Sequence, residues 1–157
     1  MSRVSVGLVS SAVVALLRST LPAEVAVGDG RAPAPGEDDV RRNGPTATGT
    51  RRGYGIVYQI PGGAALGQGY LGEDTAIRAV RFQVMGCGVS RAQAQGVADL
   101  MVGVLCDRDD VSRAFVHTLS VAGHAVLDRV EVGDVPQDDE HGLVQMGYLV
   151  DVVVQAS

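Results

Sequence analysis

The change of hydrophobic period between residues 76–85 and residues 90–105 constrains the fold more than any other feature of the sequence. The first segment alternates apolar and polar side chains, which predicts a strand with one buried face. The second segment begins with Ser90 and Gln93, the spacing of a capping box, and then repeats apolar residues at helical spacing. Its apolar stripe consists of Val97, Leu100, Met101, Val104 and Leu105. A strand followed by an amphipathic helix is therefore expected here.

A second amphipathic helix is expected at the start of the chain. Apolar residues recur at helical spacing between Val6 and Leu21, and Pro22 ends the pattern. Arg18 interrupts the run, which stays short of the roughly 20 apolar residues that a membrane span needs. We therefore expect an opening helix in an intracellular protein rather than a secretory signal or a membrane anchor.

The remaining segments predict strands separated by polar connections. Residues 28–53 have no periodicity and gather glycine, proline and charged residues, so we expect a long loop there. Residues 133–142 contain Pro136 and several acids, and they predict a polar turn that closes a hairpin. The further expected strands are residues 24–27, 54–60, 114–121, 125–132 and 144–154.

This order of elements predicts an α+β fold. Consecutive strands with modest connections pair as antiparallel hairpins, so we expect a mostly antiparallel sheet of about 4–6 strands. Two amphipathic helices then pack on one face of that sheet. The 157 residues are enough for one domain with a sizeable core, and we expect residues 1–157 to form a single domain.

The charge pattern argues against broad nucleic-acid binding. The formal net charge is -5, and all 13 basic side chains are arginine. The loop at residues 28–53 holds two arginine pairs, Arg41 with Arg42 and Arg51 with Arg52. Neither pair has interleaved aromatic residues, so both are poor platforms for stacking on bases. The pairs are either solvated or dock on an acidic surface of another subunit.

No motif predicts a catalytic, cofactor or metal site. Residues 67–72 match the Gly-x-Gly-x-x-Gly spacing, but an alternating segment follows instead of the helix that a phosphate site requires. Cys87 and Cys106 lie too far apart for a zinc motif and are expected to be reduced. A cysteine nucleophile with His124 as its base stays an open alternative, although no local signature supports it.

The acids of the expected turn at residues 133–142 are Asp134, Asp138, Asp139 and Glu140. Their spacing lacks the alternating ligands and central glycine of a calcium loop. Neighbouring carboxylates in a polar turn are most simply solvated charge, so we expect no cation there.

Three passages carry a resemblance to a known family. They are an arginine-led strand that leads through Gly86 into an alanine-rich helix, a turn that starts a strand, and a valine-rich final strand. These passages span residues 77–105, 123–129 and 143–152. Together with the opening helix, the chain resembles the tail-terminator (tail-completion) proteins of long-tailed bacteriophages over nearly its whole length.

The resemblance implies a virion protein without catalytic residues or cofactors. Members of that family form a ring, most often of six copies, that caps the head-proximal end of the tail tube and ends tube polymerisation. The implied partners are further copies of the chain, the tail tube protein and a neck or head-completion protein. DNA passes through such a ring without sequence-specific recognition, no membrane is involved, and the virion is assembled in the host cytoplasm.

A ring needs head-to-tail contacts between different surfaces of one subunit. We therefore expect the arginine pairs Arg41, Arg42, Arg51 and Arg52 to meet acids of a neighbouring subunit or of the tube. The candidate partners are Asp134, Asp138, Asp139 and Glu140. The alternatives are a head-closure or neck connector on the portal side, a small enzyme that uses Cys87 or His124, and a ligand-binding α+β domain.

Overall fold

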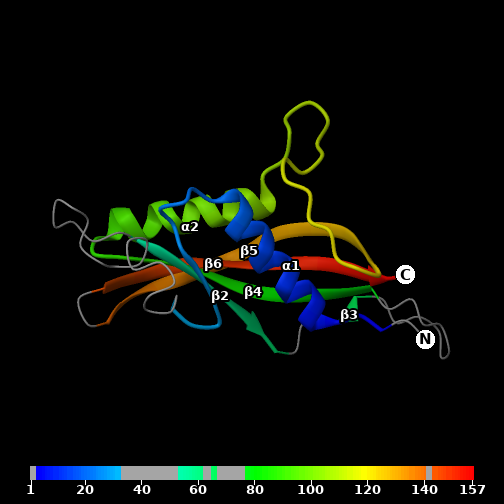
Figure 1. Cartoon of the computed structure of the whole chain (residues 1–157), viewed down its shortest axis with the longest axis horizontal. Helices are drawn as coiled ribbons and strands as arrows, with labels where there is room; N and C mark the ends of the chain where they lie inside the picture. Colours follow the sequence, from blue (N-terminus) through cyan, green and yellow to red (C-terminus); the bar gives the residue numbers. More distant parts are fainter. Residues whose placement is uncertain (1–2, 33–52, 62–64, 67–76, 141–142) are drawn as a thin grey trace.

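The computed structural model describes residues 3–32, 53–61, 65–66, 77–140 and 143–157 of the chain. The described residues form two helices and six strands (Figure 1). They are α1 Val6–Thr20, β1 Val27–Asp29, β2 Tyr54–Ile60, β3 Ala65–Leu66, β4 Ile77–Gly88, α2 Arg91–Cys106, β5 His124–Glu140 and β6 Leu143–Ala156. Most of the expected loop at residues 28–53 lies outside the described residues, and so does the glycine motif at residues 67–72.

The strands form one sheet in the order β1-β2-β4-β6-β5, with the short β3 paired to β4. β1 runs parallel to β2, and every other pairing is antiparallel. The predicted α+β fold, with a mostly antiparallel sheet and two helices, is confirmed. The parallel β1–β2 pair is the exception to the expected hairpins.

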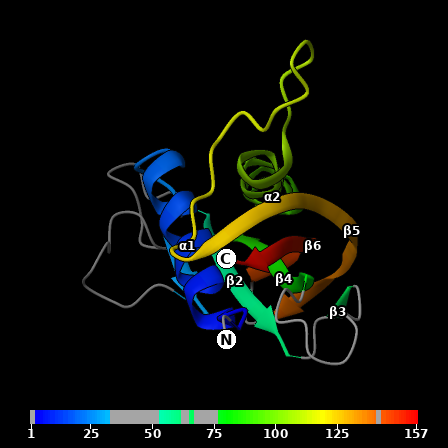
Figure 2. The same cartoon turned by 90° about the vertical axis from the view of Figure 1, so that its right-hand side faces the viewer.

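Both helices lie on one face of the sheet, and the main hydrophobic core fills the space between them and the strands (Figures 1 and 2). Leu17 of α1 and Met101 of α2 are fully buried there, as are Phe82 of β4 and Val152 of β6. Burying one such side chain stabilises the fold by about 1.5–3 kcal/mol. The apolar stripes of the two helices therefore hold them to the sheet.

α1 begins and ends close to where the sequence predicts. The hydroxyl of Ser5 accepts a hydrogen bond from the Leu8 amide at 3.4 Å, and the helix ends before Pro22. The predicted strand at residues 24–27 is wrong, since β1 starts only at Val27. The Val25 amide donates to the carbonyl of Pro22 at 2.9 Å, so a turn follows the helix before the chain extends.

α2 begins as the capping pattern predicts. The hydroxyl of Ser90 accepts from the Gln93 amide at 3.2 Å, and the Gln93 side chain accepts from the Val89 amide at 2.9 Å. Four of the five predicted stripe residues are buried, but Leu100 is 46% exposed. Ala94 and Ala98 are buried in addition, so the buried face of α2 is displaced from the predicted stripe toward these alanines.

Gly86 in β4 sets how closely α2 approaches the sheet. A Cβ atom at this position would lie 2.1 Å from the carbonyl oxygen of Ala94 and 2.7 Å from the amide nitrogen of Ala98. Both contacts are with the helix backbone, which cannot move away as a flexible side chain can. A glycine is therefore required for this packing.

The predicted hairpin between the last two strands is confirmed, since β5 pairs antiparallel with β6, but the polar turn predicted at residues 133–142 is wrong in extent, because β5 continues through this region to Glu140. The pairing of β5 with β6 shifts register at three places along the strand. Each shift inserts an unpaired residue and breaks the alternation of apolar and polar side chains. A pattern search based on strict alternation consequently stops too early.

The predicted strand at residues 114–121 is also wrong. Only single bridges occur there, between Arg108 and Phe115 and between Val121 and His124. Residues 107–121 instead form a loop whose first part projects beyond α2 and away from the sheet, and whose last part returns to the domain, where Leu119 and Val121 are buried in the main core (Figure 2). This loop is called the arm below.

The face of the sheet opposite the helices carries a smaller apolar cluster and an ion pair. The buried members of the cluster are Tyr54, Ile56, Met85 and Cys87. Arg81 and Asp151 are direct partners across β4 and β6, and two hydrogen bonds of 2.7 and 2.9 Å join them. This bidentate pair raises the pKa of Arg81 through its hydrogen bond with Asp151.

Candidate interaction surface

Neither cysteine is prepared for nucleophilic chemistry. Cys87 is fully buried in β4, and burial raises the pKa of its thiol to about 11. Burial also raises the pKa of the Cys106 thiol, at the end of α2, to about 11. The thiolate is the nucleophilic form, and both thiols hold their protons at neutral pH.

His124, the other candidate of the enzyme alternative, joins two elements. Its Nε2 accepts a hydrogen bond from the Ser5 amide at 2.9 Å, and its Nδ1 lies 2.7 Å from the Ala122 carbonyl oxygen. Accepting at Nε2 requires the neutral ring with its proton on Nδ1, which then donates to that carbonyl. Both ring nitrogens are engaged with the backbone, so His124 braces the start of α1 against the start of β5.

Within the part of the chain that the structure describes, no three His, Cys, Asp or Glu side chains gather as a metal site would require. Neither described helix is long and apolar enough to cross a membrane.

The arm has a defined backbone. The Asp109 amide donates to the Ala114 carbonyl at 2.8 Å, and the Arg113 amide donates to the Asp109 carbonyl at 2.9 Å. The Asp109 carboxylate accepts from the amides of Val111 and Ser112 at 3.0 and 2.7 Å, and the bond from Ser112 is the main reason that its pKa is lowered. Arg113 turns the chain with a φ of 61°. The tip of the arm is thus a closed, hydrogen-bonded turn.

Two arginines fix the arm to the body of the domain. The guanidinium carbons of Arg108 and Arg129 lie 3.9 and 4.0 Å from the centroid of the Phe115 ring. Arg108 also donates to the Asp128 carboxylate of β5 at 2.6 Å. Arg129 of β5 is 3% exposed and donates to the His117 carbonyl, and its pKa is lowered mainly by burial. These stacking and charge-assisted contacts make the arm an ordered extension of the fold.

The arm presents an apolar tip between acidic side chains. Val111 is 93% exposed and Val116 is 56% exposed. Asp107 and Asp110 are exposed beside them. A valine held almost wholly in water at the end of an ordered loop is a feature of contact surfaces.

β5 presents a free edge with acidic side chains. It is the last strand in the sheet order, and among the described residues no strand pairs with its outer side. Asp134, Asp138 and Asp139, expected in a turn, are instead exposed along this strand, and Glu140 is its last residue. Residues 99–140 hold ten acidic residues and three arginines. The acids expected as a subunit contact are therefore brought together on one edge.

The arginines expected to meet these acids, Arg41, Arg42, Arg51 and Arg52, lie outside the described residues. Sequence reasoning also missed the arm. Its signal in the sequence is Asp109 followed by small and polar residues, a pattern typical of side-chain-closed turns. The buried anchor Arg129 has no such signal, because its partners are distant in the chain.

The described residues define a two-layer α+β domain whose most distinctive exposed features are the arm and the acidic edge of β5. No family model and no curated protein matches the sequence. Among solved structures, the fold is similar to a chain of the "Virion of native gene transfer agent (GTA) particle". The two chains superpose with a TM-score of 0.59 at 15% sequence identity, and the match covers 96% of each. The whole chain therefore shares its fold with that virion component.

Proposed function

We propose that this chain is a structural protein of a phage-like virion. The observation that carries the proposal is the full-length likeness of its fold to a chain of a gene transfer agent virion. The neutral, buried Cys87 and the doubly engaged His124 support a structural role over the enzyme alternative. The arm and the acidic edge supply the different surfaces that an assembling subunit needs.

The specific role that we propose is tail termination. The subunits form a ring, with six copies as the expected number, that caps the head-proximal end of the tail tube and ends its polymerisation. The ring joins the tail to a neck protein and lets DNA pass without reading its sequence. The acidic character of residues 99–140 fits a surface that does not hold DNA.

Electron microscopy of the purified protein and a tube-polymerisation assay test this role. Rings in the micrographs and tubes of limited length after addition of the protein are the expected results. A head-closure or neck connector on the portal side is the second candidate. Such a protein would form rings but would leave tube growth unchanged.

We further propose that the arginine pairs meet the acids of β5 on a neighbouring subunit or on the tube. Three of these acids are exposed on a free edge, where a neighbouring surface can reach them. Reversing Arg41, Arg42, Arg51 and Arg52 to Glu should weaken ring formation while the monomer stays folded. Light scattering measures assembly, and circular dichroism measures folding. Unchanged rings in the quadruple variant contradict this contact.

A further inference from the structure

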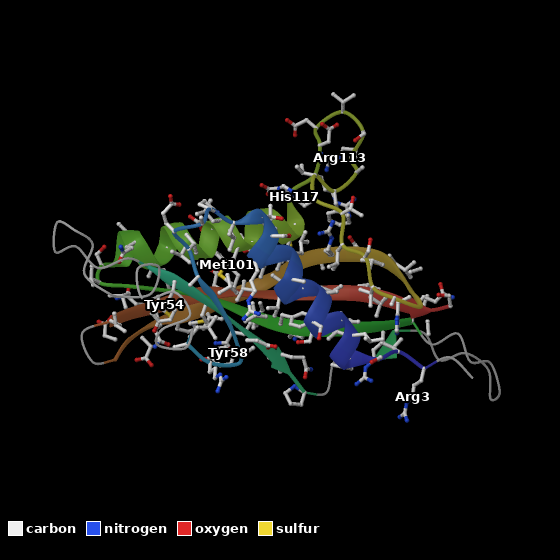
Figure 3. The ribbon with its side chains drawn as sticks, viewed as in Figure 1. Arg3, Tyr54, Tyr58, Met101, Arg113 and His117 are labelled. Carbon is white, nitrogen blue, oxygen red and sulfur yellow. The ribbon has the colours of Figure 1, made fainter. Side chains whose placement is uncertain are left out.

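The arm is prepared for contact before any partner binds. Its tip is closed by hydrogen bonds to Asp109, and its base is held by Arg108 and Arg129 around the Phe115 ring. Figure 3 shows Arg113 on this loop, outside the two layers of the domain, and His117 nearer to the end of α2. An ordered loop loses little conformational freedom on binding. The burial of the exposed Val111 side chain against a partner would therefore stabilise the contact at low entropic cost.

The charge of the arm selects the kind of surface that it fits. Asp107 and Asp110 flank the apolar tip and are exposed, while Asp109 is occupied by the turn itself. Arg108 is paired with Asp128 at the base of the arm. A partner must therefore offer an apolar or small-residue surface beside cationic side chains.

A second surface of this same chain offers apolar and cationic side chains. Residues 3–32 hold three arginines against two acids, Glu24 and Asp29, whereas residues 99–140 hold ten acids against three arginines. α1 carries no acidic residue, and its exposed side chains include Leu8, Ala15 and Arg18. Arg18 reaches β1 through a 3.1 Å hydrogen bond to the Val27 carbonyl, and the exposed Arg31 follows this strand. We call these side chains of α1, together with Arg31, the α1–β1 surface.

The two surfaces lie apart on the molecule. In the sheet order β1 and β5 are the two ends, and β5 holds the base of the arm through Asp128 and Arg129. Figure 3 shows the labelled Arg113 on one side of the domain and Arg3, just before α1, on the other. A contact between two such surfaces joins copies head to tail, and it leaves one copy with a free α1–β1 surface and the other with a free arm.

We propose that the arm of one copy docks on the α1–β1 surface of a second copy, with Val111 against the exposed side of α1 and the acids of the arm near Arg18 and Arg31. The partner is thus another molecule of this chain. This inference rests on the proposed ring, because it names the contact through which the ring closes.

A photo-crosslinker at position 111 tests the contact directly. We would replace Val111 by p-benzoylphenylalanine in the full chain, irradiate the assembled protein, and identify the linked peptides by mass spectrometry. Links between copies to peptides from residues 3–32 are expected. Rings whose links fall elsewhere overturn the docking inference and leave the proposed function intact, whereas the absence of rings in the unmodified protein contradicts the proposed function itself.

A mixing experiment tests the head-to-tail geometry. Val111→Asp removes the apolar tip and keeps the α1–β1 surface, while Ala15→Glu adds an acid to α1 and keeps the arm. Each variant alone should associate about tenfold more weakly or worse, since burial of one valine contributes on this scale. An equimolar mixture should form dimers through the one intact pair of surfaces, measured by analytical ultracentrifugation.

Val89→Asp serves as the matched control, because Val89 is an exposed valine at the start of α2 and away from both surfaces. This variant should assemble like the unmodified protein. Circular dichroism confirms that all variants are folded. Normal assembly of Val111→Asp, or a mixture that stays monomeric, overturns the inference.

Discussion

Replacing Arg129 by Met should loosen the arm while changing the overall stability little. The guanidinium group of Arg129 is 3% exposed, and its Nη2 donates to the His117 carbonyl. Its Nε and Nη1 are buried without a hydrogen-bond partner among the described residues. Burial also lowers its pKa, which shows that the charged form is disfavoured at this place.

The opposing contributions are of similar size. Each unpartnered buried donor costs about 1–3 kcal/mol, and Met removes both. The lost charge-assisted hydrogen bond contributes about 1.5–3 kcal/mol, and the lost stacking on Phe115 about 0.5–2 kcal/mol. Met has a similar apolar stem, so packing is largely kept. The free energy of unfolding should therefore change by less than about 2 kcal/mol.

Urea unfolding measures the global free energy, and hydrogen exchange with mass spectrometry measures the opening of residues 107–121. Arg129→Met should increase exchange in the arm by tenfold or more, at nearly unchanged urea midpoint. Arg113→Met is the control, since this exposed arginine belongs to the same loop. A destabilisation above about 4 kcal/mol, which would mark Arg129 as a net stabilising core residue, or unchanged exchange in the arm, would refute the reasoning.

Three further outcomes are expected. Gly86→Ala places a Cβ 2.1 Å from a helix carbonyl and should lower the free energy of unfolding by about 3 kcal/mol. Gly96→Ala, with open space around the new Cβ, should raise the free energy of unfolding by about 0.5–1 kcal/mol. Thermal unfolding compares the two variants, and equal effects contradict the packing argument. Asp109→Ala should speed amide exchange at the arm tip without moving the melting temperature, and a slower exchange would exclude the proposed turn. Burial raises the pKa values of the Cys87 and Cys106 thiols from 9.0 to about 11. The stability that these buried thiols contribute is therefore present below pH 9 and is lost as the pH rises through 11. Urea midpoints that increase over this pH range contradict the raised pKa values.

The helices could be predicted from the sequence because their signals are local. Ser90 and Gln93 lie three residues apart, and the capping contacts need nothing beyond the first turn. The residues of the predicted apolar stripe of α2 are buried with one exception, Leu100, which is exposed. The burial of this residue depends on the outline of the sheet beneath the helix, which no local pattern contains.

The second half of β5 could not be predicted because the bulges that shape it are tertiary features. Its length depends on pairing with β6, and each register shift reverses which residues face the core. Pro136 and the neighbouring acids read as a turn when strand pairing is ignored. A proline is tolerated in β5 because this is an edge strand.

The arm escaped prediction for the opposite reason. Residues 114–121 contain enough apolar side chains for a strand, but none of the strands that the structure describes pairs with them. Their backbone is held by turn contacts and by Arg129, a residue of β5. A segment rich in strand-forming residues does not form a strand where no partner strand pairs with it.

The acids of β5 also protect the free edge of this strand from pairing with another copy. The exposed side chains of Leu127, Val130 and Val132 lie on a strand of 17 residues with one free edge, and they would favour uncontrolled pairing between copies. Register shifts and carboxylates such as Asp134 disfavour that pairing, since bulges break the ladder and a like-charged strand repels an identical one. Strand addition would therefore have to overcome the features that protect this edge. The proposed docking through the arm does not use this edge, so its acids would stay accessible to the proposed arginine partners of a neighbouring subunit or of the tube.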